Sequence, residues 1–156
     1  MPLYVNNTEI TDEQVFAEMQ YHPASSLPEA QERAAQALAI RELLLQEAAR
    51  LEISAPDEAA TQEVQEDFLI SRLLEQEVIT PEPDEASCQR YYEQNRKTFR
   101  DTEGNPVLFE YVQPTIAAYL KEASWQTAVK QYLKVLVGKA RIAGIHLEGA
   151  DSPLVQ

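Results

Sequence analysis

The sequence predicts an all-α fold, and three observations indicate this class. Only 4 of the 156 residues are glycine. Alanine, leucine, glutamate and glutamine, which favour helices, are abundant, and β-branched residues never form the long alternating runs that are typical of strands. The length suffices for one domain with its own core. We therefore expect a single domain over residues 1–156, with N-terminal helices over residues 1–100, a linker over residues 101–108 and a C-terminal helix with a tail over residues 109–156.

The N-terminal part predicts a short extended piece followed by a first helix. Residues 3–5 favour an extended conformation, and residues 6–7, both asparagine, favour a turn. Thr11 is followed three residues later by Gln14, which is typical of a capping box, and acidic residues occupy the first turn, where the helix dipole favours them. The pattern predicts a helix over about residues 12–20.

Three more helices are expected before residue 100. A central helix over residues 29–52 contains no glycine or proline and repeats apolar residues every three or four positions. A third helix, over about residues 58–79, shows an apolar stripe with acidic residues on its other side. The prolines of segment 80–83 favour an extended backbone. Asp84 is expected to cap a fourth helix that ends near Thr98.

The longest helix is predicted after a short turn. Residues 101–106 are rich in turn-forming residues and predict a surface turn between two helices. Residues 109–143 then carry a wide apolar face at helical spacing. Gly144 is a plausible C-cap, and residues 145–156 predict an extended strap or a frayed tail.

The charge of the chain restricts its partners and its location. The formal net charge is −13, with 20 Asp and Glu against 8 Lys and Arg in residues 1–100, and 6 against 5 in the remainder. Because an acidic protein repels phosphate backbones, no nucleic-acid partner is expected. No run approaches the 18 apolar residues of a membrane span, and no secretory signal is visible. We expect a soluble cytoplasmic protein, or a periplasmic one if a signal sequence has been removed.

No pattern for catalysis or for a cofactor is recognisable. The single cysteine, Cys88, excludes an internal disulfide. His22 and His146 lie more than a hundred residues apart and lack the spacing of paired metal ligands. Neither a phosphate-binding glycine loop nor a nucleophile elbow is present. The sequence therefore indicates no catalytic, metal or cofactor site and favours a non-enzymatic function.

Aromatic residues are concentrated in one part of the chain. Most of the large rings lie between residues 91 and 132, in the helices on either side of the short turn. A buried core is the simpler interpretation for most of them, but more rings than one small core needs would indicate an exposed groove or a dimer surface. Trp125 is the first choice for a contact residue. The full set of candidate partner contacts is Tyr91, Phe109, Tyr119, Trp125 and Tyr132.

Four stretches resemble a known family. VNNTEITDEQV at residues 5–15 is similar to the opening of the N-terminal domain shared by SurA-like chaperones and PpiC-type, NifM-like parvulin prolyl isomerases. Residues 34–53 resemble the central helix of that domain, and residues 83–100 resemble its Y-Y-x-x-N-x-x-x-F segment. Residues 109–147 resemble the helix that follows the isomerase domain, so that the resemblance covers nearly the whole chain.

The resemblance implies a chaperone module without its catalytic domain. In these families an isomerase domain of about a hundred residues separates the last two of the matching stretches. Here only residues 101–108 occupy that place, and both histidines lie elsewhere. The resemblance thus implies a SurA N-terminal-like helical module, completed by the long C-terminal helix, with an apolar groove for client proteins. It also implies that a homodimer could form by exchange of terminal helices.

Three functions remain open at this point. The first is a non-catalytic chaperone or assembly factor that binds unfolded or partly folded client proteins. The second is a structural or dimerisation module with one dedicated protein partner. The third is a peptidyl-prolyl cis-trans isomerase, or a fragment of one.

Overall fold

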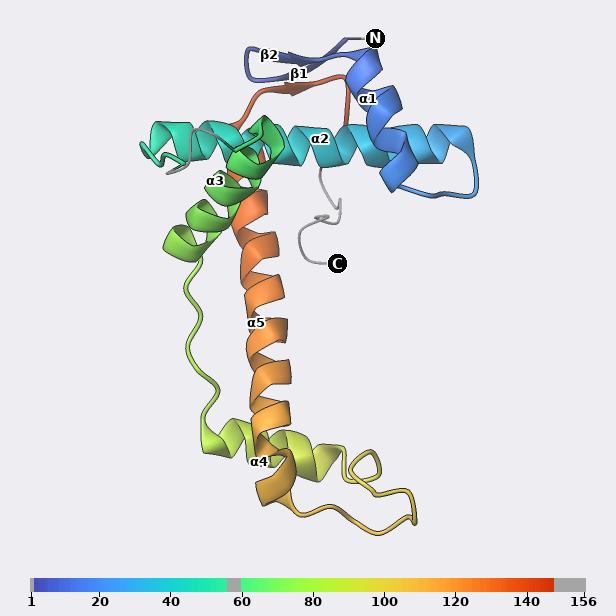
Figure 1. Ribbon diagram of the computed structural model, residues 1–156, viewed down its shortest axis with the longest axis vertical. Coiled ribbons are helices and arrows are strands. Elements are labelled where there is room, and N and C mark those ends of the chain that lie inside the picture. The colour runs from blue at the N-terminus through green and yellow to red at the C-terminus, as the bar shows by residue number, and fades with distance from the viewer. Residues whose placement is uncertain (1, 56–59, 148–156) are drawn as a thin grey trace. The chain divides into compact units, whose positions relative to one another are not determined.

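The chain folds into two compact units. A computed structural model describes residues 2–55 and 60–147. Unit 1 combines residues 1–78 with residues 129–156, and unit 2 is formed by residues 79–128. Helix α5 (Phe109–Lys139) contributes its first twenty residues to unit 2 and its last turns to unit 1. Figure 1 shows the order of the elements along the chain.

The all-α prediction is wrong, because unit 1 contains a three-stranded antiparallel sheet in the described residues, with the order β2-β1-β3. Strands β1 (Leu3–Val5) and β2 (Thr8–Ile10) form a hairpin, as the extended piece and the turn at Asn6 predicted in part. The third strand, β3 (Ile142–Ala143), pairs with β1 from the other end of the chain. Strands of two or three residues are too short to show an alternating pattern, so the sequence could not reveal the sheet.

The helices of unit 1 begin close to the positions that the sequence predicts. The capping box is confirmed: the Thr11 hydroxyl accepts a hydrogen bond from the Gln14 amide at 3.2 Å, and the Gln14 side chain accepts one from the Thr11 amide at 2.8 Å. Pro28 stands in the first turn of the central helix, where its missing amide hydrogen costs nothing. The helical segments that precede α5 in unit 1 are α1 (Asp12–Glu18), η1 (Met19–Tyr21), α2 (Leu27–Arg50) and α3 (Gln62–Glu77).

Helix α2 is the centre of unit 1. The sheet, α1 and α3 all pack against it (Figure 1). Its first half buries small alanine side chains, which allow close packing, and its second half buries Leu43 and Leu44. Leu73 of α3 and Val129 of α5 are also completely buried in this unit. The first half of α2 thus packs closely against its neighbours, and the second half fills the core with larger side chains.

Some apolar residues of unit 1 face solvent, contrary to the predicted stripes. Val15 of α1 is buried, whereas its neighbour Phe16 is 79% exposed. Successive residues on a helix point about 100° apart, so the two side chains cannot both face α2. Val64 and Phe68 of α3 are exposed in a similar way, at 57% and 40%.

Gly144 does not cap α5, which ends at Lys139. It follows β3 with a φ of +87°, and a Cβ at this position would lie 2.6 Å from the Pro2 carbonyl oxygen. Only glycine therefore allows this segment to lie so close to β1. The Gln36 side-chain amide then donates a hydrogen bond to the His146 carbonyl oxygen at 3.1 Å, which fastens the segment to α2. The rest of the predicted tail, residues 148–156, lies outside the described residues.

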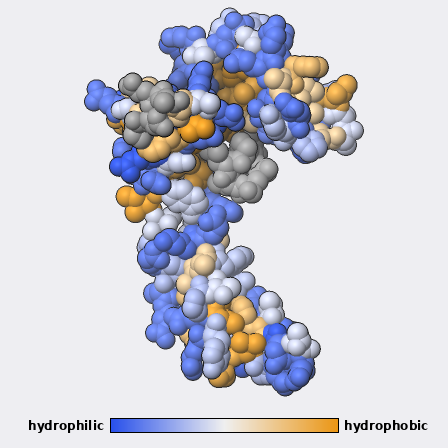
Figure 2. All heavy atoms as spheres, viewed as in Figure 1, coloured by the Kyte–Doolittle hydropathy of each residue, from blue (hydrophilic) through white to orange (hydrophobic). Residues whose placement is uncertain are grey.

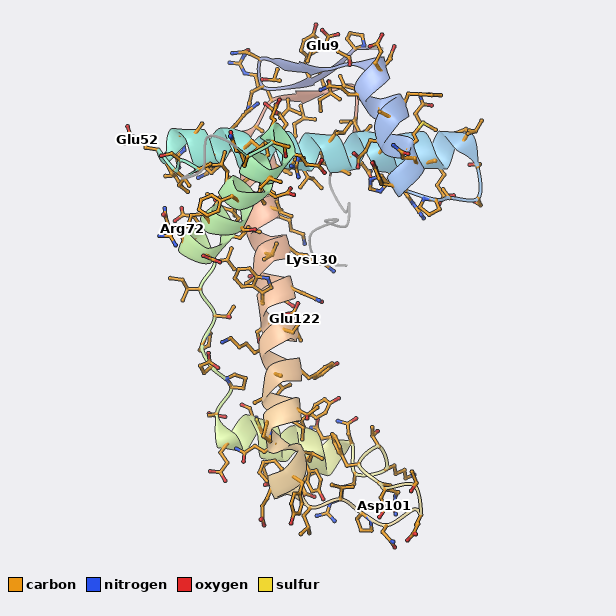
Figure 3. All side chains as sticks on the ribbon, in the orientation of Figure 1. Glu9, Glu52, Arg72, Asp101, Glu122 and Lys130 are labelled. Carbon is orange, nitrogen blue, oxygen red and sulfur yellow. The ribbon has the colours of Figure 1, made fainter. Side chains whose placement is uncertain are left out.

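Unit 2 consists of α4 (Glu85–Gln94), the first part of α5 and the loop between them. The predicted cap is confirmed, since the Asp84 carboxylate accepts a hydrogen bond from the Ser87 amide at 2.7 Å. The predicted turn is confirmed as well: residues 101–106 are exposed, and the Asp101 carboxylate accepts hydrogen bonds from the amides of Glu103 and Asn105, both at 2.9 Å (Figure 3). In the described ranges, no helix has both the length and the apolar character of a membrane span.

Candidate functional site

Unit 2 contains a cluster of five aromatic rings, which we call the aromatic cluster: Tyr91 and Tyr92 of α4, Phe99 of the loop, and Phe109 and Tyr119 of α5. The centroids of Tyr91 and Tyr119 lie 5.2 Å apart, and Tyr92 lies 5.5 Å from both phenylalanines. Tyr91 also contacts Phe99 edge to face at 6.1 Å. Ring pairs at such distances contribute about 0.5–1.5 kcal/mol each beyond area burial. The cluster thus joins α4, the loop and α5.

The inner side of the cluster forms a small core. Cys88, Tyr92 and Ile116 are the buried residues of this core, and the rings of Tyr91, Phe99 and Phe109 pack against them. The Tyr92 hydroxyl donates a hydrogen bond to the Val107 carbonyl oxygen at 2.6 Å, which fixes the loop against α4. The thiol of Cys88 is free and buried among these side chains. Its place is that of a core residue.

The outer side of the cluster is open to solvent. Leu108, Tyr111 and Tyr119 are 58%, 74% and 56% exposed. Tyr111 and Tyr119 are eight residues apart and so lie on one side of α5, because eight residues correspond to little more than two turns, and Leu108 directly precedes the helix. Tyr91 of α4 packs against Tyr119 at one end of this row. We call these four residues the aromatic surface. Figure 2 shows hydrophobic residues exposed in unit 2.

The chemistry of this surface suits contact with a polypeptide. Tyrosine combines a large apolar ring with a polar tip and loses little conformational entropy on binding, which explains its enrichment at protein interfaces. Burial and the neighbouring Tyr119 raise the pKa of Tyr91. Unit 2 carries 8 acidic and 5 basic residues, a net charge of −3 in 50 residues, against −13 in the 156 residues of the whole chain.

The structure brings together three of the five predicted contact residues. Tyr91, Phe109 and Tyr119 belong to the aromatic cluster. Trp125, the first choice from the sequence, is half-buried later in α5, and in the described residues no ring pair links it to the cluster. Tyr132 belongs to unit 1.

Tyr132 has an unusual environment of its own. Its hydroxyl oxygen is buried and has no hydrogen-bond partner in the described part of the chain. Burial, together with the nearby carboxylates of Glu47 and Glu77, raises its pKa to about 12. The Arg50 guanidinium opposes this shift only in part. Tyr132 is therefore a packed residue of unit 1 whose hydroxyl is poorly solvated.

The sequence analysis missed Leu108 and Tyr111. Both are large, both are exposed, and both stand at helical spacing from Tyr119. That spacing was visible in the sequence and could have identified them, although spacing alone does not distinguish a buried stripe from an exposed one. Knowledge of which side of α5 faces α4 was needed for that distinction.

The remaining titratable candidates do not form a chemical site. The His22 ring nitrogen lies 2.8 Å from a Glu18 carboxylate oxygen one turn away, and His146 belongs to the segment after β3. Over residues 2–55 and 60–147, no group of three or more His, Cys, Asp and Glu side chains could hold a metal ion.

Comparisons with family models, with curated proteins and with solved structures found no match to this chain. The resemblance to SurA-like and PpiC-type proteins therefore stays a prediction. What can be said about function depends on the geometry of the residues described above.

Proposed function

We propose that this protein is a non-catalytic chaperone or assembly factor that binds unfolded or partly folded client proteins at the aromatic surface of unit 2. The observation that carries the proposal is the exposed row Leu108, Tyr111 and Tyr119 beside Tyr91. The occupant that fits this row is an apolar, aromatic-containing client segment, because it would cover the rings without placing a charge against them.

The size of the surface suits transient binding. Covering apolar area stabilises a complex by roughly 25 cal/mol per Å². Much of this gain is offset by the loss of translational freedom and by the ordering of the client segment. A few partly exposed rings should therefore give dissociation constants on the order of 1–100 µM. Such affinities permit repeated capture and release.

The family resemblance supports the same function. Residues 83–100 and 109–147, which carry much of the resemblance, contain three of the four residues of the aromatic surface. Residues 101–106, at the place where the relatives carry their isomerase domain, form an exposed turn. We include a cytoplasmic location in the proposal, since the one thiol, Cys88, is free and needs no oxidising compartment.

A light-scattering assay of heat-unfolded citrate synthase tests the proposal. The unmodified protein should slow aggregation of this client. The double variant Tyr111→Ala, Tyr119→Ala should lose most of this activity, whereas Tyr21→Ala, which removes a ring that is 69% exposed in unit 1, should keep it. Circular dichroism of each variant checks that the helices are retained. A double variant as active as the unmodified chain would contradict the assignment of the surface.

The same variants discriminate the other functions that the sequence left open. If the aromatic surface joins two copies of the chain, the unmodified protein will sediment as a dimer, the double variant will sediment as a monomer, and neither will slow client aggregation. If the chain is an isomerase, it will accelerate cis-trans exchange in a proline-containing peptide. We expect no acceleration and no effect of the double substitution on sedimentation.

A further inference from the structure

Unit 1 contains a pocket of about 420 Å³ between α1, α2 and the segment that follows β3, which we call the α1–α2 pocket. Its apolar floor includes Leu3, Val15 and Ala35, and Val15 and Ala35 are buried. Asp12, Glu32 and His146 also line the pocket, and both acidic residues are exposed. The pocket therefore combines apolar residues with two acidic residues and one histidine.

The walls of the pocket are held in place by other contacts. Glu32 and Ala35 lie on one face of α2, three residues apart. Helices α1 and α2 form two walls, and the segment at residues 144–146 forms the third. Gly144 has a positive φ, which allows this segment to lie against β1. The hydrogen bond from Gln36 to the His146 carbonyl fixes the same wall to α2. A ligand would thus meet a preformed site, which lowers the entropic cost of binding.

Among the described residues, no lysine or arginine forms an ion pair with Asp12 or Glu32, and His146 is the other titratable residue of the lining. The first 32 residues contain six Asp and Glu and no Lys or Arg. Arg33, the next basic residue, donates to a Glu29 carboxylate oxygen at 2.7 Å and to the Pro23 carbonyl oxygen at 3.2 Å. Unit 1 as a whole holds 18 acidic and 8 basic residues.

We propose that the α1–α2 pocket binds an arginine or lysine side chain from a partner polypeptide. The aliphatic stem of such a side chain would cover the apolar floor while its charged head reaches Asp12 and Glu32, the arrangement that long basic side chains favour. Phe16 and Leu27 are 79% and 76% exposed, and each neighbours a pocket-lining residue in sequence. Figure 2 shows apolar atoms over α1 and the start of α2, so the residues that flank the basic side chain should be apolar.

This site goes beyond the proposed function, because it lies in the other unit and selects for a positive charge. A partner with a basic residue between apolar residues would fit it. An acidic or neutral segment would lack the group that the two carboxylates attract. The aromatic surface of unit 2 has no such preference.

Calorimetric titration of the full chain with two peptides tests the proposal. One is acetyl-Leu-Ala-Arg-Ala-Leu-amide, and the other carries citrulline, an uncharged analogue of arginine, at the centre. The arginine peptide should bind about three- to tenfold more tightly at low salt, as expected for a charge-assisted contact near a protein surface. Equal affinities, or no binding of either peptide, would overturn the proposal.

A matched pair of variants locates the contact. Glu32→Gln should weaken binding of the arginine peptide about three- to fivefold and leave the citrulline peptide unaffected. Glu52→Gln makes the same charge change just after the C-terminal end of α2, twenty residues from Glu32 in sequence. It should change neither affinity. Figure 3 shows Glu52 at that end of the helix. Equal effects of the two substitutions would mean that only the net charge attracts the peptide, and would contradict a specific site.

A blocking variant gives an independent check. Gln31 is an exposed helical residue that lines the pocket, so Gln31→Phe should fill the pocket while the helix is kept. Binding of both peptides should then be lost. The double variant Tyr111→Ala, Tyr119→Ala alters only the aromatic surface and should bind both peptides normally. The peptide titrations therefore test the α1–α2 pocket independently of the proposed client binding. Binding that survives Gln31→Phe would place the peptide elsewhere and overturn the assignment.

Discussion

Unit 1 and unit 2 differ sharply in how much apolar surface they bury. Among the described residues, 20 hydrophobic side chains are buried in unit 1 and only 3, Cys88, Tyr92 and Ile116, in unit 2. Unit 1 covers its core with a sheet and several helices, whereas unit 2 has one short helix, a loop and part of α5. We infer that unit 1 supplies most of the stability of the chain.

The two units also differ in the character of their exposed surface. Unit 1 carries 18 acidic and 8 basic residues, and unit 2 carries 8 and 5. The net charge is thus −10 in unit 1 and −3 in unit 2, and the larger negative charge of unit 1 favours solubility.

The largest expected effect comes from cavities in the two cores. Leu44→Ala empties a completely buried site in unit 1 and should lower the free energy of unfolding by about 3–5 kcal/mol. Ile116→Ala in unit 2 should instead reduce the hydrogen-exchange protection of α4 while α2 stays protected. Urea denaturation and residue-level hydrogen exchange measure these changes. If Ile116→Ala reduces the hydrogen-exchange protection of α2 and α4 equally, the two units unfold together, which contradicts a difference in their stability.

Alanine substitutions at two glycines should change the free energy of unfolding in opposite directions. Gly144→Ala should destabilise unit 1 by about 2 kcal/mol or more, because a positive φ disfavours alanine and the new Cβ would overlap the Pro2 carbonyl oxygen. Gly138→Ala places the same methyl group on α5, where no atom lies within 4 Å, and should stabilise by about 0.5–1 kcal/mol. Urea denaturation measures both variants. A midpoint below that of the unmodified protein for Gly144→Ala, and one above it for Gly138→Ala, would confirm the role of Gly144.

A smaller effect is expected from the hydrogen bond that holds the loop in unit 2. Tyr92→Phe removes the donor to the Val107 carbonyl and should cost about 1 kcal/mol of local stability. Tyr111→Phe makes the same chemical change at a ring that is 74% exposed. Hydrogen exchange of α4 should become faster in the first variant only. Equal exchange in both variants would show that the loop is not held by this bond.

The smallest expected change in stability comes from Tyr132 of unit 1 and should appear only at high pH. The pKa of Tyr132 is raised from 10.0 to about 12, mainly by burial. The contribution of the protonated hydroxyl to stability is therefore fully present below pH 10 and is lost as the pH rises from 10 towards 12. Tyr132→Phe should flatten this part of the stability profile, measured by urea denaturation between pH 8 and pH 11. An unchanged slope would contradict the burial of this hydroxyl.

Local signals in the sequence predicted much of the helical architecture. The caps at Thr11 and Asp84 were identified correctly because a cap depends on side chains within three residues of it. The sheet was missed because β3 has two residues and pairs with a strand near the opposite end of the chain. Gly144 was assigned to the wrong role for the same reason, since the need for glycine comes from β1 rather than from α5.

The candidate site was predictable only in outline. The concentration of rings around the loop pointed to the correct part of the chain, and three of the five chosen residues belong to the aromatic cluster. Which rings are exposed depends on the side of α5 that meets α4, and this information is tertiary. Trp125 and Tyr132 were chosen for their size, which says nothing about their orientation. The α1–α2 pocket could not be foreseen, because three separate segments form it.

The pairing of β1 with β3 bears on how the chain is made. Tyr4 and Ala143 lie opposite each other in the sheet, although nearly the whole described chain separates them. At a synthesis rate of about 5–20 residues per second, β1 waits roughly ten seconds or longer for its second partner. During that time its free edge could pair with another nascent chain. Unit 2 is continuous in sequence, so its aromatic surface can form on the ribosome before unit 1 is complete.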